Sequence, residues 1–178
     1  MRPLLFLDVD GPLNPFHASL AALQEGYTAH SLRPRGWAPP LPALRVLLNP
    51  DHGEQLLRLP YELVWATTWE HEANSMIGPR VGLPELPVVE LPARGSAPDG
   101  VFFKTPALVE YAAGRPFVWV DDELTDRDHE YACNHHRAAL LLHRISPAHG
   151  LVERDLDLLA RWEPARTAAM VPGKAHEG

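Results

Sequence analysis

Residues 4–11 read Leu-Leu-Phe-Leu-Asp-Val-Asp-Gly, and this stretch decides the fold class of the chain. The first four residues are apolar without interruption, which is typical of a short strand buried on both faces of a sheet. Two carboxylates, Asp8 and Asp10, follow at alternate positions where the strand should end. The stretch therefore predicts a central strand with acidic groups at its carboxyl end.

Similar apolar runs recur along the chain and alternate with helical patterns. Four more strands are predicted, at residues 63–66, 87–91, 117–120 and 138–142. Helices are predicted at residues 51–59, 70–77, 105–113, 124–136 and 152–162. This alternation predicts an α/β fold. We expect a three-layer, Rossmann-like arrangement in which helices flank a parallel sheet of about five strands.

One region, residues 14–50, interrupts the alternation. Residues 27–32 and 44–48 are predicted to form a β-hairpin around a proline-rich turn, and we interpret this insert as a flap or small lid. Residues 1–162, this insert included, are predicted to form a single domain. The segment 163–178, rich in Ala, Pro and Gly, is predicted to be a flexible tail.

Composition limits the partners of this 178-residue chain. Its formal net charge of -7 argues against nucleic acid and anionic membranes as partners. A phosphorylated substrate stays compatible, because a bound cation can invert the local field. The only cysteine, Cys133, excludes a disulfide within the chain, and the apolar run at 4–7 is too short for a signal peptide or membrane span. We expect a cytoplasmic protein.

The ends of the predicted strands carry the residues that suggest chemistry. In parallel sheets, ligands bind outside the carboxyl ends of the strands. Thr67 and Thr68 follow the second strand, and Lys104 precedes the helix that leads into the fourth. Asp121 and Asp122 follow that fourth strand. We expect these groups to converge with Asp8 and Asp10 at one edge of the sheet.

Such a set suits phosphoryl transfer. One carboxylate can attack phosphorus, and a second can protonate the leaving oxygen and then activate water. Several carboxylates without cysteine suit Mg²⁺, which takes oxygen ligands. An ammonium and a hydroxyl can hold the remaining phosphoryl oxygens.

At these positions the chain resembles the haloacid dehalogenase (HAD) superfamily. Residues 8–13 resemble motif I of that family, Thr67 resembles motif II, and Lys104 resembles motif III. The pair at residues 121–122 resembles the double-Asp form of motif IV. All four occur in order, and the resemblance spans roughly residues 3–142.

The resemblance implies a role for each matching residue. It implies Asp8 as the nucleophile and Asp10 as the acid and base. It implies phosphate contacts from Thr67 and Lys104, and Thr68 and Gly11 are further candidates for phosphate binding. It implies Mg²⁺ held by Asp8, the backbone carbonyl of Asp10 and Asp121, with Asp122 nearby.

The chain departs from the family pattern in several places. Pro12 replaces the usual Thr or Val of motif I. Motif II is ambiguous between Thr67 and Thr68, and we favour Thr67 because it directly ends the apolar run. Too few residues separate Thr67 from Lys104 for a large cap domain, so any cap must be the insert at 14–50.

Each candidate also has a plain structural interpretation. Asp8 taken alone could cap a turn, and Lys104 taken alone is typical of a solvated surface. His129, Cys133 and His136 share one helical face, where a zinc site is conceivable but a polar face is favoured, since no fourth ligand is present at fixed spacing. His71 fits the mouth of the site and an exposed position equally well.

The leading hypothesis is therefore hydrolysis of a phosphate monoester through an aspartyl-phosphate on Asp8. The alternatives are phosphotransfer to another acceptor, as in a phosphomutase, and a non-catalytic binding module that keeps the fold. Halide displacement is disfavoured, because Asp10 and a magnesium site would have no role in it.

Overall fold

The computed structural model describes residues 1–18, 26–35 and 37–164. The predicted flexible tail, 163–178, lies outside the described residues from residue 165 onward. Within the described ranges, no helix combines the length and the apolar character that a membrane span requires.

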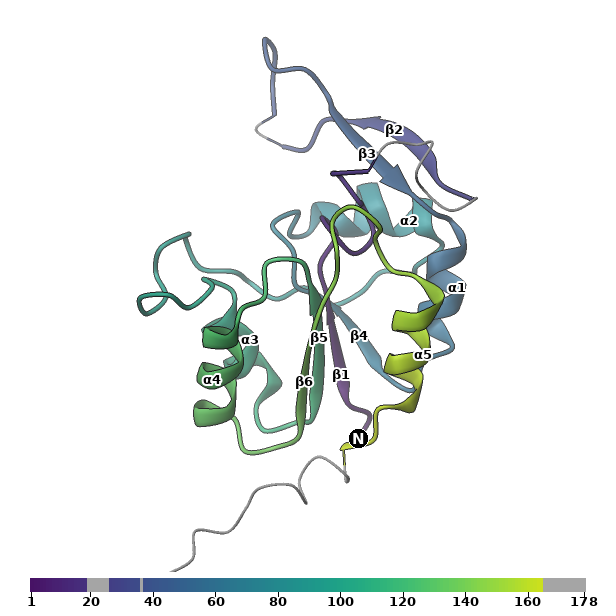
Figure 1. Ribbon diagram of the computed structural model, residues 1–178. Helices are drawn as coiled ribbons and strands as arrows, with labels where there is room; N and C mark the ends of the chain where they lie inside the picture. The colour runs from purple at the N-terminus through teal and green to yellow at the C-terminus, as the bar shows by residue number, and fades with distance from the viewer. Residues whose placement is uncertain (19–25, 36, 165–178) are drawn as a thin grey trace, which may run out of the picture.

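A four-stranded parallel sheet forms the centre of the molecule, with the strand order β4-β1-β5-β6 (Figure 1). Its strands are β1 (Leu4–Leu7), β4 (Glu62–Trp65), β5 (Phe117–Asp121) and β6 (Leu140–Arg144). Leu7 pairs with Trp65 on one side and with Val120 on the other. The predicted α/β class and parallel sheet are confirmed. Because β1 is an inner strand of the sheet, the acidic residues that follow it lie between the ends of its two neighbouring strands.

The predicted strand at 87–91 is wrong, so the sheet of the described residues has four strands instead of about five. Val88 forms only an isolated bridge with Trp65. The Trp65 N–H donates to the carbonyl of Pro87, and the Val89 N–H donates back to Trp65, both at 2.9 Å. Prolines 84, 87 and 92 surround this point. Because proline has no N–H to donate, the pairing cannot extend into a ladder.

Helices cover both faces of the sheet, with α3 and α4 on one side and α1 and α5 on the other (Figure 1). Their bounds are α1 (Asp51–Leu57), α3 (Thr105–Ala112), α4 (Asp126–His135) and α5 (Glu153–Arg161). The predicted helix at 70–77 is instead a π-helical segment (Ala73–Ile77) that continues into the short α2 (Gly78–Val81).

Side chains of β1 alternate between the two apolar cores. Leu5 and Leu7 belong to the cluster that includes Leu56 of α1 and Leu159 of α5. Leu4 and Phe6 belong to the second cluster, which contains Leu108 of α3 and Ala132 of α4. Because successive side chains of a strand point to opposite faces, an uninterrupted apolar run serves both cores at once.

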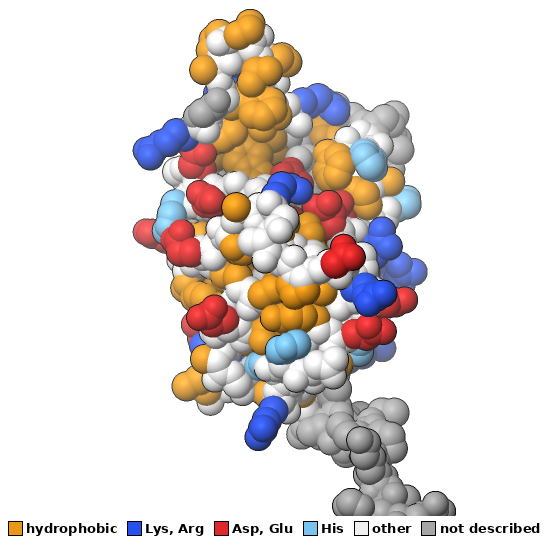
Figure 2. Space-filling view, turned by 90° about the vertical axis from the view of Figure 1, so that its left-hand side faces the viewer, with side chains coloured by type: hydrophobic (Ala, Val, Ile, Leu, Met, Phe, Trp, Pro, Cys, Tyr) orange, Lys and Arg blue, Asp and Glu red, His pale blue; other side chains and the backbone are white. Residues whose placement is uncertain are grey.

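The predicted hairpin is confirmed as an antiparallel pair, β2 (Thr28–Leu32) and β3 (Leu44–Leu48). It lies beyond the carboxyl ends of the parallel strands (Figure 1), and apolar side chains cover much of its visible surface (Figure 2). The last three residues of β3 are buried, and Val46 and Leu48 join the same core cluster as Leu5 and Leu7. The base of the insert is therefore part of the core.

Candidate functional site

The turn after β1 brings the nucleophile candidate to the edge of the sheet. Asp8 is 5% exposed, and its N–H donates to the carbonyl of Val120 at 3.1 Å. Gly11 has a φ of +87°, and a Cβ at this position would lie 2.6 Å from the carboxyl carbon of Asp122. Only glycine satisfies both the conformation and the space, so Gly11 lets Asp122 approach the motif I turn.

Lys104 connects the strand ends through a buried ammonium group. Its side chain is almost fully buried, and Nζ donates to Oδ2 of Asp8 at 2.7 Å and to Oδ2 of Asp121 at 2.8 Å. Burial alone would lower the pKa of Lys104, but the charges of Asp8 and Asp121 outweigh burial and raise it above its ordinary value. Lys104 is therefore a charged part of the site, which excludes the surface interpretation.

A carboxylate of α4 fixes the segment that carries Lys104. Asp128 is fully buried, and its Oδ1 accepts from the N–H of Phe102 at 2.7 Å and from the hydroxyl of Thr105 at 2.6 Å. Its other oxygen accepts from Thr125 at the start of α4. The Asp128 side chain therefore accepts hydrogen bonds from Thr125 at the start of α4 and from Phe102 and Thr105, which lie on either side of Lys104.

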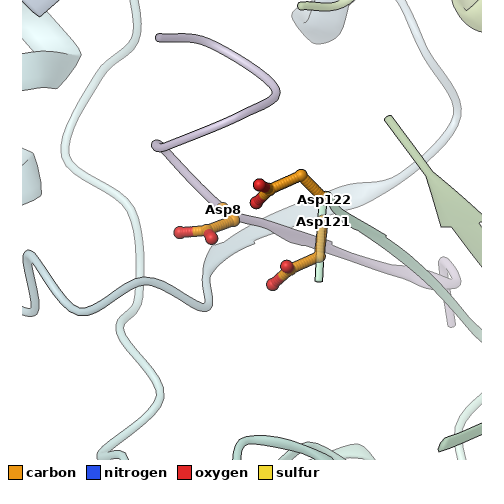
Figure 3. Close-up of side chains that lie close together, drawn as sticks. All are labelled: Asp8, Asp121 and Asp122. Carbon is orange, nitrogen blue, oxygen red and sulfur yellow. The ribbon is translucent and has the colours of Figure 1, made fainter. Parts of the chain in front are cut away.

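Three carboxylates converge beside this ammonium. Ligand oxygens of Asp8, Asp121 and Asp122 all lie within 4.8 Å of one another (Figure 3). Burial, and then the charge of Asp8, raise the pKa of Asp122 to about 6 and raise that of Asp121 well above its usual range. Burial is the larger cause of both shifts, and the nearby Asp8 carboxylate adds to it, while the Lys104 ammonium only partly opposes the rise.

The donor set fits a divalent cation. All three side chains offer oxygen, which is the ligand type that Mg²⁺ prefers, and a doubly charged ion would offset the excess of negative charge. Among the described residues, this is the one group of three or more His, Cys, Asp or Glu side chains close enough to share an ion. Asp8, Asp121 and Asp122 are thus the residues that could hold a metal.

The Asp10 carboxylate lies outside that group. Its Oδ1 accepts from Nδ2 of Asn14 at 2.7 Å, and its Oδ2 accepts from Nε1 of Trp69 at 2.9 Å. Burial is the largest influence on its pKa and raises it, while the two hydrogen bonds oppose that rise. A carboxyl group with a raised pKa between neutral donors is suited to exchanging protons.

Thr67 and Thr68, the two candidates for motif II, lie in different environments. Thr67 is fully buried, and its hydroxyl accepts from the N–H of Trp69 at 3.3 Å. Thr68 lines the cavity that contains Asp8 and Lys104. The roles predicted for both hydroxyls stay predictions, and Thr68 is the one that faces the cavity.

A cavity of about 540 Å³ opens over these groups. Its wall includes five residues that the sequence did not single out, namely Asn14, His17, Arg45, Trp69 and Arg94. Two of them lie near predicted strand ends, since Asn14 is four residues after Asp10 and Trp69 directly follows Thr68, but the sequence does not show which way their side chains point. The two arginines come from the hairpin and from a loop, and no motif or strand end in the sequence singles them out.

The remaining histidines and the cysteine do not join the site. His136 Nε2 contacts the carbonyl oxygen of Arg115 at 2.9 Å, whereas the exposed Cys133 lies 3.8 Å from the ring nitrogens of His129. His136 is thus occupied by a backbone carbonyl, and among the described residues these three side chains do not come close enough together to share an ion, which favours the polar-face interpretation over a zinc site. His71 is exposed and pairs with Glu90 at 2.8 Å.

Comparisons with protein-family models, with curated proteins and with solved structures found no match to this chain. The function of the chain is therefore inferred from the side chains that the sheet brings together, from their burial and from their charge.

Proposed function

We propose that this chain is a magnesium-dependent phosphohydrolase of the HAD superfamily that cleaves a phosphate monoester through an aspartyl-phosphate on Asp8. The observation that carries the proposal is the buried ammonium of Lys104, which bridges Asp8 and Asp121 beside Asp122. A surface lysine or a simple helix cap would not produce this arrangement. The order of the strands and the four motifs support the Rossmann-like assignment.

In the first step, an oxygen of Asp8 forms a bond to phosphorus while the bond between phosphorus and the leaving oxygen breaks. Asp10, protonated at this stage, gives its proton to that leaving oxygen. Lys104 stays hydrogen-bonded to Asp8 and offsets the negative charge that gathers around the transferring group. The products of this step are the released alcohol and the aspartyl-phosphate.

In the second step, Asp10 acts as a carboxylate and removes a proton from water. The water oxygen bonds to phosphorus, and the bond from phosphorus to Asp8 breaks. Inorganic phosphate leaves, and the enzyme regains a free Asp8 and a protonated Asp10. Placing Asp10 apart from the metal-binding carboxylates suits this use, because its neighbours are neutral hydrogen-bond donors.

Mg²⁺ would be held by Asp8, Asp121, Asp122 and the backbone carbonyl of Asp10. When bound, it supplies positive charge that offsets the carboxylates and draws the anionic phosphoryl group toward Asp8. Arg45 and Arg94 line the same cavity, so the residues around the substrate include basic groups from two further segments.

A phosphatase assay tests the proposal. Purified protein is assayed with nitrophenyl phosphate and a panel of phosphorylated metabolites and phosphopeptides, with Mg²⁺ and with EDTA. We expect turnover that needs Mg²⁺ and is abolished by Asp8→Asn. Asp157→Asn is the matched control, because Asp157 is exposed on α5 and should leave activity unchanged. Undiminished turnover in EDTA, or an active Asp8→Asn protein, would contradict the proposal.

A further inference from the structure

Both oxygens of the Asp10 carboxylate are held by neutral side chains from separate parts of the chain. Asn14 donates to Oδ1 at 2.7 Å and Trp69 donates to Oδ2 at 2.9 Å. Both side chains are buried, Asn14 at 3% exposure and Trp69 at 7%. The Asp10 carboxylate is therefore held at two points, in a wall of the cavity that also contains Asp8 and Lys104.

The orientation of the Asn14 amide follows from its second contact. The backbone N–H of Leu47 in β3 donates to Oδ1 of Asn14 at 2.9 Å. A backbone N–H can only donate, so the carbonyl oxygen of Asn14 must face Leu47. Its NH₂ group must then face Asp10. The same amide thus connects the hairpin to the Asp10 carboxylate and has one orientation that satisfies both contacts.

Trp69 adds a constraint of the same kind. The indole N–H is a donor only, so it fixes one lone pair of Asp10 Oδ2 while Asn14 fixes one of Oδ1. A proton on Asp10 must occupy one of the remaining lone pairs. The two contacts therefore restrict the direction in which Asp10 can deliver a proton or receive one.

We propose that Trp69 and Asn14 are positioning residues that fix this direction, and that β3 takes part through the Leu47 N–H. The inference rests on the proposed function, since it assigns Trp69 and Asn14 to the proton transfer carried out by Asp10. It predicts that the loss of either hydrogen-bond donor lowers kcat/KM most for substrates whose leaving oxygen depends most on protonation by Asp10.

Two leaving groups test the inference. Nitrophenolate departs with little protonation, whereas an alkoxide needs the proton from Asp10, so kcat/KM is measured for nitrophenyl phosphate and for an alkyl phosphate. Trp69→Phe removes the indole N–H and keeps an aromatic ring. We expect it to lower kcat/KM for the alkyl phosphate by ~10-fold or more, with a loss of less than ~3-fold for the aryl phosphate, because general acid catalysis contributes ~10²-fold or more.

Asn14→Asp is the second variant, because it keeps an acceptor for the Leu47 N–H and loses the donor to Asp10. It should show the same dependence on the leaving group. Trp37→Phe is the matched control, since it also removes an indole N–H, one that donates to Pro42 within the insert. Its kcat/KM should equal that of the parent for both substrates.

The outcomes separate this inference from the proposed function. A parent protein inactive on both substrates would overturn the proposed function and this inference with it. An active parent whose Trp69→Phe variant is unchanged, or loses equally on both substrates, would leave the phosphatase in place and overturn the positioning role. If Asn14→Asp fails to fold, Trp69→Phe decides alone.

Discussion

Lys104 is the residue on which the charge balance of the site depends. Lys104→Ala removes the positive charge that contacts Asp8 and Asp121. We expect kcat to fall by ~10²-fold or more, the scale observed when one electrostatic stabiliser is removed. Steady-state kinetics on nitrophenyl phosphate measure the effect, and circular dichroism verifies that the variant is folded.

Arg58→Ala is the control for this substitution, because Arg58 follows α1 and is exposed. It should leave kcat unchanged. A Lys104→Ala protein whose kcat stays within ~2-fold of the parent would show that the ammonium stabilises no transition state.

Asp10→Asn separates the two aspartates of the motif I turn. Nitrophenolate leaves without much protonation, so phosphorylation of Asp8 should partly survive, while hydrolysis loses its base. We expect a burst of nitrophenolate and a phosphorylated enzyme that acid quench traps at Asp8. The new amide would also point its NH₂ at a donor, either Asn14 or Trp69, so the melting temperature should fall as well.

Asp8→Asn should show neither the burst nor the label. Label found at position 10, or normal labelling of the Asp8→Asn protein, would reverse the assignment of roles.

The sequence predicted the parts of the site that lie at strand ends. Asp8, Asp121 and Asp122 converge because the carboxyl ends of two neighbouring parallel strands, β1 and β5, lie at the same edge of the sheet, and apolar runs in the sequence locate both strand ends. Trp69 and Asn14 were missed for a different reason. Trp69 is 59 residues from Asp10, and its contact depends on a side-chain direction that no local pattern encodes.

At the scale of elements, α1 packs closely against the end of α2 through Gly53. A Cβ at this position would lie 2.1 Å from the carbonyl oxygen of Val81 and 2.6 Å from that of Gly82. We expect Gly53→Ala to lower the free energy of unfolding by about 1–3 kcal/mol or more, as overpacking of a core does. Chemical denaturation measures the change, and Gln55→Ala, exposed on the same helix, is the control.

An unchanged denaturation midpoint in Gly53→Ala would show that α1 can shift away from α2 at no cost. The close approach would then be no constraint on the packing of these two helices.

The hairpin is the element whose interpretation changes most. If residues 14–50 formed a lid that moves as a whole, their backbone amide hydrogens would exchange faster without ligand than with it. Because the last three residues of β3 are buried and the Leu47 N–H bonds to a buried side chain, we expect this amide to be protected in the ligand-free protein. Hydrogen exchange followed by NMR measures it, with the amide of Phe6 in β1 as the reference.

Rapid exchange at Leu47 that slows with Mg²⁺ and beryllofluoride would favour a lid that moves as a whole. Protection with or without ligand would make β3 a fixed wall of the cavity.

Element prediction succeeded where one physical signal dominated. The parallel strands followed from uninterrupted apolar runs, since burial decides them. The hairpin followed from the proline-rich turn between its two strands, because residues 28–31 of β2 are exposed or half-buried. The strand at 87–91 failed because prolines outweigh an apolar run when a ladder needs N–H donors. The helix predicted at 70–77 begins later, at Ala73, because Glu70 has a φ of +47°, a left-handed conformation that a right-handed helix cannot contain.

For the whole molecule, one buried histidine should make stability depend on pH. Burial lowers the pKa of His52 from 6.5 to about 4. Below pH 6.5 the unfolded chain binds a proton that the folded chain does not, so stability should fall as the pH falls and level off near pH 4. This shift corresponds to as much as about 3 kcal/mol.

His52→Phe removes the titration and keeps an aromatic ring beside Tyr27. Urea denaturation from pH 7.5 to pH 4 should therefore show a difference between parent and variant that grows across this window. A difference that stays constant with pH would mean that His52 titrates normally in the folded protein.

The contact between Asn14 and Leu47 also determines which changes in the amino-acid sequence of the insert can be tolerated. Leu47 contributes its main-chain N–H, which every amino acid except proline possesses. A grafted or evolved hairpin of different sequence would preserve the contact, provided that its strands keep the same alignment. A deletion of a single residue within β3 before position 47 would break it, because the alternation of the strand would turn the inward face outward. Substitutions in the insert should then be tolerated far more readily than changes in its length.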